Sequence, residues 1–378
     1  MLDRRALLKS ALYTAPVFTA GRLYAAPTAS MRLLVVFLRG AYDATNIVVP
    51  VSSSFYYESR KTIAIPKNAA LPLDSDWGLH PALKDTIYPL WQNKQVAFVP
   101  FAGTDDLTRS HFETQDTIEL GQPISVSRDY RSGFMSRTAS VLTGSVPIAF
   151  TAQLPLTFRG GAAISNVALN TTATSGVQGR EFAPAAAQGF EVRNDVYNAI
   201  SSEMMAANRN AVATRGFELS AQRIGSLMKN RFNLGFIDVG GWDTHVNQGG
   251  VDGYLANRIG ELGRGLAALS GALGEKWNDT VVIVVSEFGR TFRENGDRGT
   301  DHGHGSTYWV LGGGIKGGRI AGPQVAVTHA NLFQDRDWPV LTDYRALIGG
   351  MLKRSYGLSQ AQLIQIFPQA SPADLALV

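Results

Sequence analysis

The chain has 378 residues, of which 45% are hydrophobic and 17% charged, so it is long and apolar enough to bury a large core. Most of its formal net charge of +4 comes from the first 26 residues, and no basic stripe with interleaved aromatic residues is present, so no nucleic-acid partner is expected. The absence of cysteine excludes disulfides and thiolate metal ligands, so any metal must be held by histidine, carboxylate, hydroxyl or backbone groups.

The first element in chain order is an export signal. Arg4 and Arg5 are followed by two leucines and a lysine, which is the twin-arginine (Tat) pattern. The apolar stretch 10–21 is too short to cross a bilayer, which takes roughly 20 apolar residues, and small residues follow it up to Ala29. We expect residues 1–29 to be a signal peptide, read by the Tat export machinery through residues 1–22. The mature chain would then be periplasmic or secreted, with no transmembrane anchor.

Strands and helices alternate along the rest of the chain. Continuous apolar runs of strand length occupy 31–38, 96–101, 234–239, 280–286 and 307–311, and helical patterns occupy 111–120, 192–206, 216–229 and 253–273. Such runs are typical of strands that are covered on both faces. We therefore expect residues 30–378 to form a single α/β domain, with a mainly parallel central sheet and helices on both faces. Residues 121–209 are expected to be an insertion or a lid, with weak strands between 147 and 169.

Polar residues follow four of the predicted strands, and four of the six histidines lie in these loops. In an open α/β sheet, ligands bind outside the carboxyl ends of the strands. Glycines flank Asp243 and His245, and also Asp301, His302 and His304, so the backbone can turn sharply enough for these side chains to converge. Imidazole and carboxylate donors suit zinc, manganese or iron better than calcium. We expect one or two such divalent ions here; loops that merely carry polar surface residues are the alternative.

Two further residues each have two interpretations. Ser110 precedes the predicted helix 111–120, with Glu113 three positions later, which is the pattern of a capping box. Alternatively, its hydroxyl at a helix N-terminus attacks phosphorus or sulfur, and Arg109 binds the oxyanion. Asp43 is either a turn residue after the first strand or a carboxylate that binds metal. The residues alone leave both questions open.

Five runs of residues resemble one bacterial family. They are FLRGAYDATNIVVP, TRSHFETQD, GGWDTHVNQ, VVIVVSEFGRTFRENGDRGTDHGHGSTYWVLGGGIKGG and the closing LTDYRALIGGML. These runs are spread along nearly the whole mature chain and resemble the Tat-exported domain of unknown function numbered fifteen-oh-one. That family is similar in turn to the alkaline phosphatase and sulfatase superfamily. The resemblance implies an alkaline-phosphatase-like α/β fold with an inserted segment.

The superfamily resemblance also implies roles for single residues. Ser110 matches the nucleophile at a helix start, Asp43 matches the metal-binding aspartate after the first strand, and Asp243 with His245 matches a later metal-binding pair. The sequence departs from the pattern at Glu287, where the superfamily usually has an aspartate and a histidine. Its cysteine-free sequence also lacks the context of a formylglycine sulfatase. The expected metal ligands are Asp43, Asp243, His245, Glu287, Asp301, His302 and His304, and the expected catalytic residues are Ser110, Arg109 and His111.

Three functions remain open on the sequence alone. The first is a periplasmic metal-dependent hydrolase of phosphate or sulfate esters, acting on an anionic small molecule or polymer. The second is a non-catalytic protein of the envelope that binds a metal or an anion. The third is an envelope interaction protein that has kept only the fold. Substrate specificity is expected to reside in residues 121–209.

Overall fold

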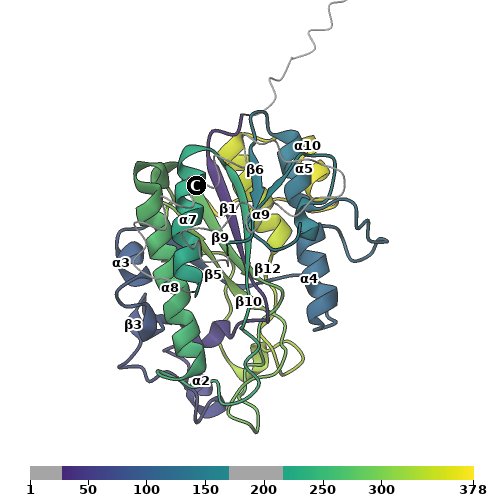
Figure 1. Ribbon diagram of the computed structural model, residues 1–378. Coiled ribbons are helices and arrows are strands. Elements are labelled where there is room, and N and C mark those ends of the chain that lie inside the picture. The colour runs from purple at the N-terminus through teal and green to yellow at the C-terminus, as the bar shows by residue number, and fades with distance from the viewer. Residues whose placement is uncertain (1–27, 170–215) are drawn as a thin grey trace, which may run out of the picture.

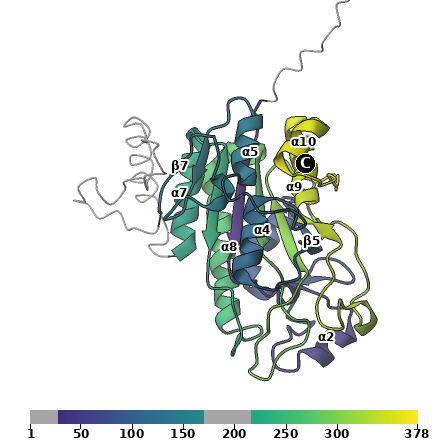
Figure 2. The ribbon, with the colours of Figure 1, turned by 90° about the vertical axis from the view of Figure 1, so that its right-hand side faces the viewer.

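The computed structural model describes residues 28–169 and 216–378, and a central sheet with helices on both faces forms their core (Figures 1 and 2). The main sheet has nine strands, eight of them in the order β11-β5-β10-β9-β1-β8-β6-β7, and β12 also pairs with β5. The strands are β1 (Arg32–Leu38), β5 (Val96–Gly103), β6 (Pro147–Ala149), β7 (Ser165–Asn166), β8 (Leu234–Val239), β9 (Thr280–Ser286), β10 (Ser306–Leu311), β11 (Arg319–Ile320) and β12 (Thr342–Asp343).

The sheet is mainly parallel, which confirms the predicted fold class, and β10 is the strand that departs from this. β1 is parallel to both of its neighbours, β8 and β9. β10 is antiparallel to its neighbours β9 and β5. The parallel strands therefore end at the edge of the sheet where β10 begins. The loop that leads into β10 joins the loops that follow β1, β8 and β9 at this edge.

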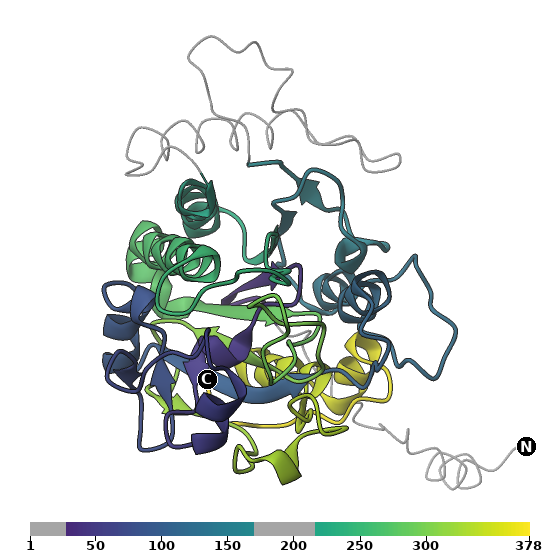
Figure 3. The same cartoon turned by 90° about the horizontal axis from the view of Figure 1, so that it is seen from below.

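Both faces of the sheet are buried. Along β1, Leu34 and Val36 face one hydrophobic core, and Val35 and Phe37 face the other, because successive side chains of a strand point to opposite sides. Figure 3 shows the sheet between two groups of helices. The first core is covered by α3 (Ile87–Gln92), α7 (Gly216–Asn230) and α8 (Tyr254–Leu273), and the second by α4 (His111–Leu120), α5 (Phe134–Val141), α9 (Tyr344–Tyr356) and α10 (Gln360–Ile366).

Most predicted elements are found where the sequence places them. The predicted helix 111–120 coincides with α4, and those at 216–229 and 253–273 match α7 and α8 to within one residue at each end. The helices α9 and α10 are additional. Asp343 begins α9 by accepting hydrogen bonds from two backbone N–H groups, and the left-handed Gly357 ends it. The predicted helix 192–206 lies outside the described residues.

The structure describes residues 121–169 of the expected insertion or lid. Within residues 121–169, α5 covers the second core and β6 pairs in parallel with β8, so this part extends the sheet. The remainder of the expected insertion, 170–209, lies outside the described residues. So does the expected signal peptide, apart from residues 28 and 29. None of the helices in the described ranges is long and apolar enough to cross a membrane.

A second, small sheet lies beyond the carboxyl end of β1. It is formed by β2 (Val48–Val49), β3 (Leu71–Pro72) and β4 (Gly78–Leu79), which pair in antiparallel fashion. The 3-10 helix η1 (Ala44–Asn46) leads from β1 into it, and the short helix α2 (Ser54–Ser59) follows β2. This region thus adds a cap at the end of the molecule where the parallel strands terminate (Figure 1).

Replacing Phe37 with alanine tests the importance of the second core. The side chain is fully buried, so Phe37→Ala should lower the free energy of unfolding by about 3–5 kcal/mol through lost burial and an unfilled cavity. Urea unfolding followed by circular dichroism measures this. The matched control Ile364→Ala removes a side chain that is 48% exposed and should change stability by less than about 0.5 kcal/mol. Equal losses in the two variants would contradict the prediction.

Candidate functional site

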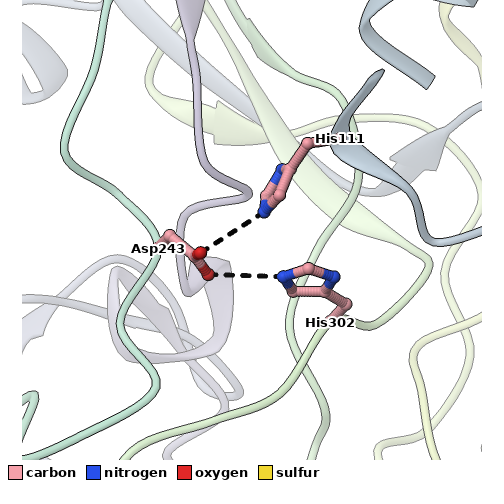
Figure 4. Close-up of side chains that lie close together, drawn as sticks. All are labelled: His111, Asp243 and His302. Atoms are coloured by element: carbon pink, nitrogen blue, oxygen red, sulfur yellow. Dashed lines mark ion pairs between the residues drawn. The ribbon is translucent and has the colours of Figure 1, made fainter. Parts of the chain in front are cut away.

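Three histidines from three different loops converge on Asp243. Asp243 and His245 follow β8, His111 is the first residue of α4, and His302 lies in the loop before β10. The Nε2 atoms of His245, His302 and His111 lie 3.0, 3.4 and 3.5 Å from the nearest Asp243 carboxylate oxygen. Figure 4 shows His111 and His302 pointing toward Asp243. The histidines predicted from the strand-end loops are thus brought together, with the exception of His304.

The spacing of these atoms suits a metal ion. Ligand atoms of His111, Asp243 and His302 all lie within 4.8 Å of one another. Donors about 2.0–2.1 Å from a tetrahedral zinc ion would be separated by about 3.3 Å, close to the observed 3.4 and 3.5 Å. The side chain of Asp243 is 43% exposed, so the group is open to solvent on one side. Two imidazoles and a carboxylate suit zinc or iron(II).

The far nitrogen of each imidazole has an acceptor. These acceptors fix the proton on Nδ1 and direct the lone pair of Nε2 toward Asp243, as in histidines that bind metals. The Nε2 atoms of His111 and His302 are buried and have no hydrogen-bond partner among the described residues. The acceptors are Glu287 Oε1 for His111 at 2.8 Å, Asp301 Oδ1 for His245 at 3.1 Å and the Arg109 carbonyl for His302 at 2.9 Å.

Glu287, an expected metal ligand, orients His111 instead. Its Oε1 accepts hydrogen bonds from His111, from Gln115 Nε2 and from the Gly40 N–H, and its Oε2 accepts one from the Ser286 hydroxyl. Burial alone would raise the pKa of Glu287, but these hydrogen bonds hold it below its ordinary value. The hydrogen bond with Glu287 in turn raises the pKa of His111. Both Glu287 oxygens are committed, which corrects its predicted role.

Asp301 has a similar supporting position. Its Oδ1 is 3.1 Å from His245 Nδ1 and accepts a hydrogen bond from Asn295 Nδ2, also at 3.1 Å. Its predicted role as a ligand is therefore corrected as well, because it faces the nitrogen of His245 that points away from Asp243. Burial would raise the pKa of Asp301, but the hydrogen bonds from Asn295 and His245 lower it.

Asp43 does not join the cluster, because its carboxylate forms an ion pair with Arg60. Both side chains are fully buried, and the guanidinium donates to both carboxylate oxygens, at 2.5 and 3.0 Å. Gln248 Nε2 donates to the same carboxylate at 2.7 Å. The predicted metal-binding role of Asp43 is thus corrected: its backbone precedes η1, and its charge is balanced by arginine. No sequence signal pointed to Arg60, which lies 17 residues away in an unremarkable stretch.

Arg290 is a second buried arginine, and it holds Asp243. Its Nη1 donates to Asp243 Oδ1 at 2.6 Å, and its other nitrogens donate to the hydroxyl and the carbonyl of Thr300. Burial would raise the pKa of Asp243, but Arg290 lowers it, so the carboxylate stays ionised. Arg290 lies three residues after Glu287, so one short segment after β9 supports both His111 and Asp243.

Arg109, which was expected to bind the oxyanion, has a side chain that already donates hydrogen bonds to other residues. Its guanidinium donates to Asp337 at 2.9 and 2.7 Å and to Gln334 at 2.6 Å. Arg109 contributes to the site through its backbone, whose carbonyl orients His302. This carbonyl is placed by a left-handed conformation with φ of 52°.

Ser110 is the N-cap residue of α4, but its hydroxyl makes no capping hydrogen bond. The predicted capping box is therefore absent, and Glu113 pairs with Arg128 instead. The Ser110 hydroxyl stands beside His111 at the positive end of the α4 dipole.

His304 lies away from the cluster. It is buried, and its ring lies against Phe333 with 5.0 Å between the ring centroids. Burial lowers its pKa to about 4. The loop after His302 turns the side chain of His304 away from Asp243 and toward Phe333. Its predicted role as a ligand is corrected for this reason.

Two glycines allow these loops to approach each other. A Cβ atom on Gly40 would lie 2.7 Å from the backbone nitrogen of Asp243, and Gly40 has φ of 115°. A Cβ atom on Gly299 would lie 2.2 Å from the carbonyl oxygen of His245. Any other residue at either position would push apart the loops that carry the site.

Comparisons with known proteins give one family and several weak structural likenesses. Residues 30–367 match the family described as "Protein of unknown function (DUF1501)", and no curated protein matches the chain. Among solved structures, a protein of the alkaline phosphatase superfamily from Vibrio parahaemolyticus is 12% identical, with a TM-score of 0.36 over 76% of this chain and 62% of that one. The chain thus spans less than two thirds of that protein.

Two further solved structures are similar to a comparable degree. Ps i-CgsB, in complex with k-i-k-neocarrahexaose, is 8% identical with a TM-score of 0.41 over 92% of this chain and 75% of that one. A 2-O GAG sulfatase is 10% identical, with a TM-score of 0.34 over 87% of this chain and 71% of that one. Likenesses of this size do not establish a shared activity.

Removing Arg60 tests the buried ion pair. Arg60→Met would leave the Asp43 carboxylate buried without its cation, so the free energy of unfolding should fall by about 3–5 kcal/mol. Adding Asp43→Asn should restore part of this loss, because the uncompensated charge is gone; urea unfolding measures both variants. The control Arg354→Met breaks an exposed pair with Asp374 and should cost no more than about 1 kcal/mol. An Arg60→Met protein as stable as the control would be inconsistent with a structural ion pair.

The buried His304 should make the metal-free protein sensitive to acid. Its pKa is about 4 in the folded chain and about 6.5 in an unfolded one, so below pH 6.5 the unfolded state binds more protons. Stability is therefore complete above pH 6.5 and is lost as the pH falls toward 4. Between pH 7.5 and pH 5 the contribution of His304 should be about 2 kcal/mol. Urea unfolding at the two pH values should show a smaller loss for His304→Gln; an identical loss would refute the assignment.

Proposed function

This chain belongs to the DUF1501 family, and we propose that it is a metal-dependent hydrolase of phosphate or sulfate esters that the Tat pathway exports to the periplasm. The observation that carries the proposal is the convergence of three histidine Nε2 atoms on the ionised carboxylate of Asp243. Two of these nitrogens are buried without a hydrogen-bond partner among the described residues. Leaving such groups unsatisfied is unfavourable unless they have a ligand.

The donor set supports one ion, with zinc favoured and iron or manganese as the alternatives. His111, His302 and Asp243 would hold the ion, and His245 Nε2 lies beside them, 3.0 Å from Asp243 Oδ1. The donors form one cluster, and Asp43 cannot contribute a second because Arg60 and Gln248 occupy its oxygens. A divalent ion held there would supply Lewis-acid stabilisation of the charge that develops on an ester oxygen.

The residues around this centre suit an anionic ester. The N-terminus of α4 presents backbone N–H groups and a positive dipole end beside His111, which favours a phosphate or sulfate group. Ser110 stands at this position, and its hydroxyl makes no hydrogen bond to the part of the chain that the structure describes, so it is the candidate nucleophile. Glu287 and Asp301 keep the imidazoles in one tautomer, and Arg290 keeps Asp243 ionised. A water molecule is the alternative nucleophile.

The export part of the proposal is supported by the sequence. Arg4 and Arg5 are followed by an apolar stretch and then by small residues, and this order is typical of a twin-arginine signal. This route carries proteins that are already folded, which is compatible with a site assembled from loops far apart in the chain. Cell fractionation tests this directly. The amount of tagged chain in the periplasm and in the cytoplasm is compared between a chain with Arg4 and Arg5 intact and one with both changed to lysine.

Metal content is the first test of the hydrolase. Protein purified without chelator should contain about one equivalent of zinc, iron or manganese by elemental analysis, since the donors form a single cluster. His111→Ala and His302→Ala should each lose most of it, because each removes one Nε2 donor. His329→Ala is the matched control: this histidine is 64% exposed and pairs with Asp335, so its loss should leave metal content unchanged. Two equivalents, or full metal in His302→Ala, would refute the single centre.

Turnover is the second test. The metal-loaded protein should hydrolyse p-nitrophenyl phosphate or p-nitrophenyl sulfate, and Ser110→Ala should lower kcat by a factor of about 10³ or more if serine attacks. Retained activity in Ser110→Ala would identify water as the nucleophile. Bound metal without turnover on either ester class would favour the non-catalytic metal-binding alternative. A protein that shows neither bound metal nor turnover would favour the third alternative, an envelope interaction protein.

A further inference from the structure

A cleft of about 520 Å³ lies outside the candidate metal centre. One wall is formed by residues 50–55 at the start of α2 together with residues 76 and 77, and the other by the extended segment 324–328. Its volume is within the range of roughly 300–1,000 Å³ that is typical of sites for small ligands. None of the residues that surround Asp243 lines it. In Figures 1 and 2, α2 lies at the lower end of the molecule, beyond the carboxyl ends of the parallel strands.

The charge of this cleft excludes an anionic group. Among the described residues that line it, Asp76 is the single ionisable side chain, and no lysine, arginine or histidine is present. Asp76 is exposed, and its carboxylate accepts a hydrogen bond from Ser75, with no ion pair in the described parts of the chain. Arg293 lies over the ring of Phe55, but its guanidinium is paired with Asp335 at 3.0 Å, so a phosphate or sulfate would find no uncompensated cation here. The cleft therefore takes a ligand of a different kind from that of the metal centre.

Apart from Asp76, the polar side chains of the cleft are uncharged, and several of them have donor or acceptor groups left for a ligand. The hydroxyls of Ser52 and Ser54 make no hydrogen bond within the described ranges, and each can donate and accept. Gln324 accepts a hydrogen bond from Trp77 Nε1 through its oxygen at 2.9 Å, which leaves its NH₂ group as a donor. These groups suit a ligand that itself both donates and accepts hydrogen bonds at several points.

The aromatic residues argue against a cationic ligand. An ammonium group is bound by exposed aromatic faces around it, but Trp77 is only 4% exposed. Phe55 already stacks on Phe292, with 4.9 Å between the ring centroids and 10° between the planes. Asp76 alone is a weak attraction for a cation, because it is solvated. The two rings thus form only the apolar floor of the cleft.

We propose that this cleft is a binding site for a neutral, hydroxyl-rich ligand of the saccharide class. Sugar hydroxyls would exchange hydrogen bonds with Ser52, Ser54 and Gln324, and Asp76 would accept from one or two of them. The site is separate from the metal centre, and its occupation requires neither metal nor hydrolysis.

Calorimetric titration of the full mature protein tests this, in metal-loaded form and after removal of metal by chelator. The probes are maltohexaose, cellohexaose and chitohexaose, with spermidine and a sulfated heparin hexasaccharide for comparison. At least one neutral saccharide should bind at millimolar concentration or below, with equal affinity in both forms of the protein. The heparin hexasaccharide and spermidine should bind no better than in the cleft variants described next.

Two substitutions separate the cleft from the rest of the surface. Ser54→Trp should weaken saccharide binding by about tenfold or more, because the larger side chain fills the space. Asp76→Asn should weaken binding several-fold. Ser127→Trp is the matched control: it places the same side chain on an exposed residue that does not line the cleft, and it should leave binding unchanged. Circular dichroism and thermal unfolding check that each variant is folded.

The proposal is overturned if none of the three neutral saccharides binds, or if binding survives Ser54→Trp unchanged. It is also overturned if spermidine or the heparin hexasaccharide binds in the cleft in place of neutral sugars. These outcomes are independent of those for the hydrolase. A protein without metal or turnover that still binds cellohexaose would support the cleft alone, and an active hydrolase that binds no saccharide would support the metal centre alone.

Discussion

The carboxylate of Asp243 is the point on which the candidate site depends. One small group faces three imidazoles and a guanidinium, each from a different direction. It remains ionised because Arg290 offsets the cost of partial burial. The buried Nε2 atoms of His111 and His302 face this anion, and the three groups lie close enough together to suit one divalent ion. The loops after β5, β8 and β9 therefore share one electrostatic centre.

The two aspartates at the ends of β1 and β8 illustrate how environment decides the use of a carboxylate. Asp43 is fully buried, and both of its oxygens accept hydrogen bonds from Arg60, so its charge is balanced within the protein. Asp243 is 43% exposed and has Arg290 on one oxygen, which leaves room for a further partner. The same pairing of aspartate with arginine thus closes off one carboxylate and leaves the other partly exposed beside the histidines.

The proposed metal centre and the proposed saccharide cleft differ in charge. The first combines imidazoles with the positive end of α4, and both would favour an anionic group. The cleft beside α2 has hydroxyls, an amide and one carboxylate, which together favour a neutral polar ligand. Both are built on connections at the carboxyl ends of the strands, where an α/β sheet leaves its loops free to vary.

The sequence by itself determined five strands of the main sheet (β1, β5, β8, β9 and β10), the helices α4, α7 and α8, and the loops in which the histidines lie. Apolar runs such as 280–286 form strands because both faces are covered, and this is a local property of composition. Which side chains meet was decided only by the tertiary structure. His302 reaches Asp243 because β10 runs antiparallel and so begins at the edge where β8 ends, and Asp43 is withheld because Arg60 folds back onto it. Strand direction and the pairing of distant charges depend on packing across the whole sheet, which no short stretch of sequence encodes.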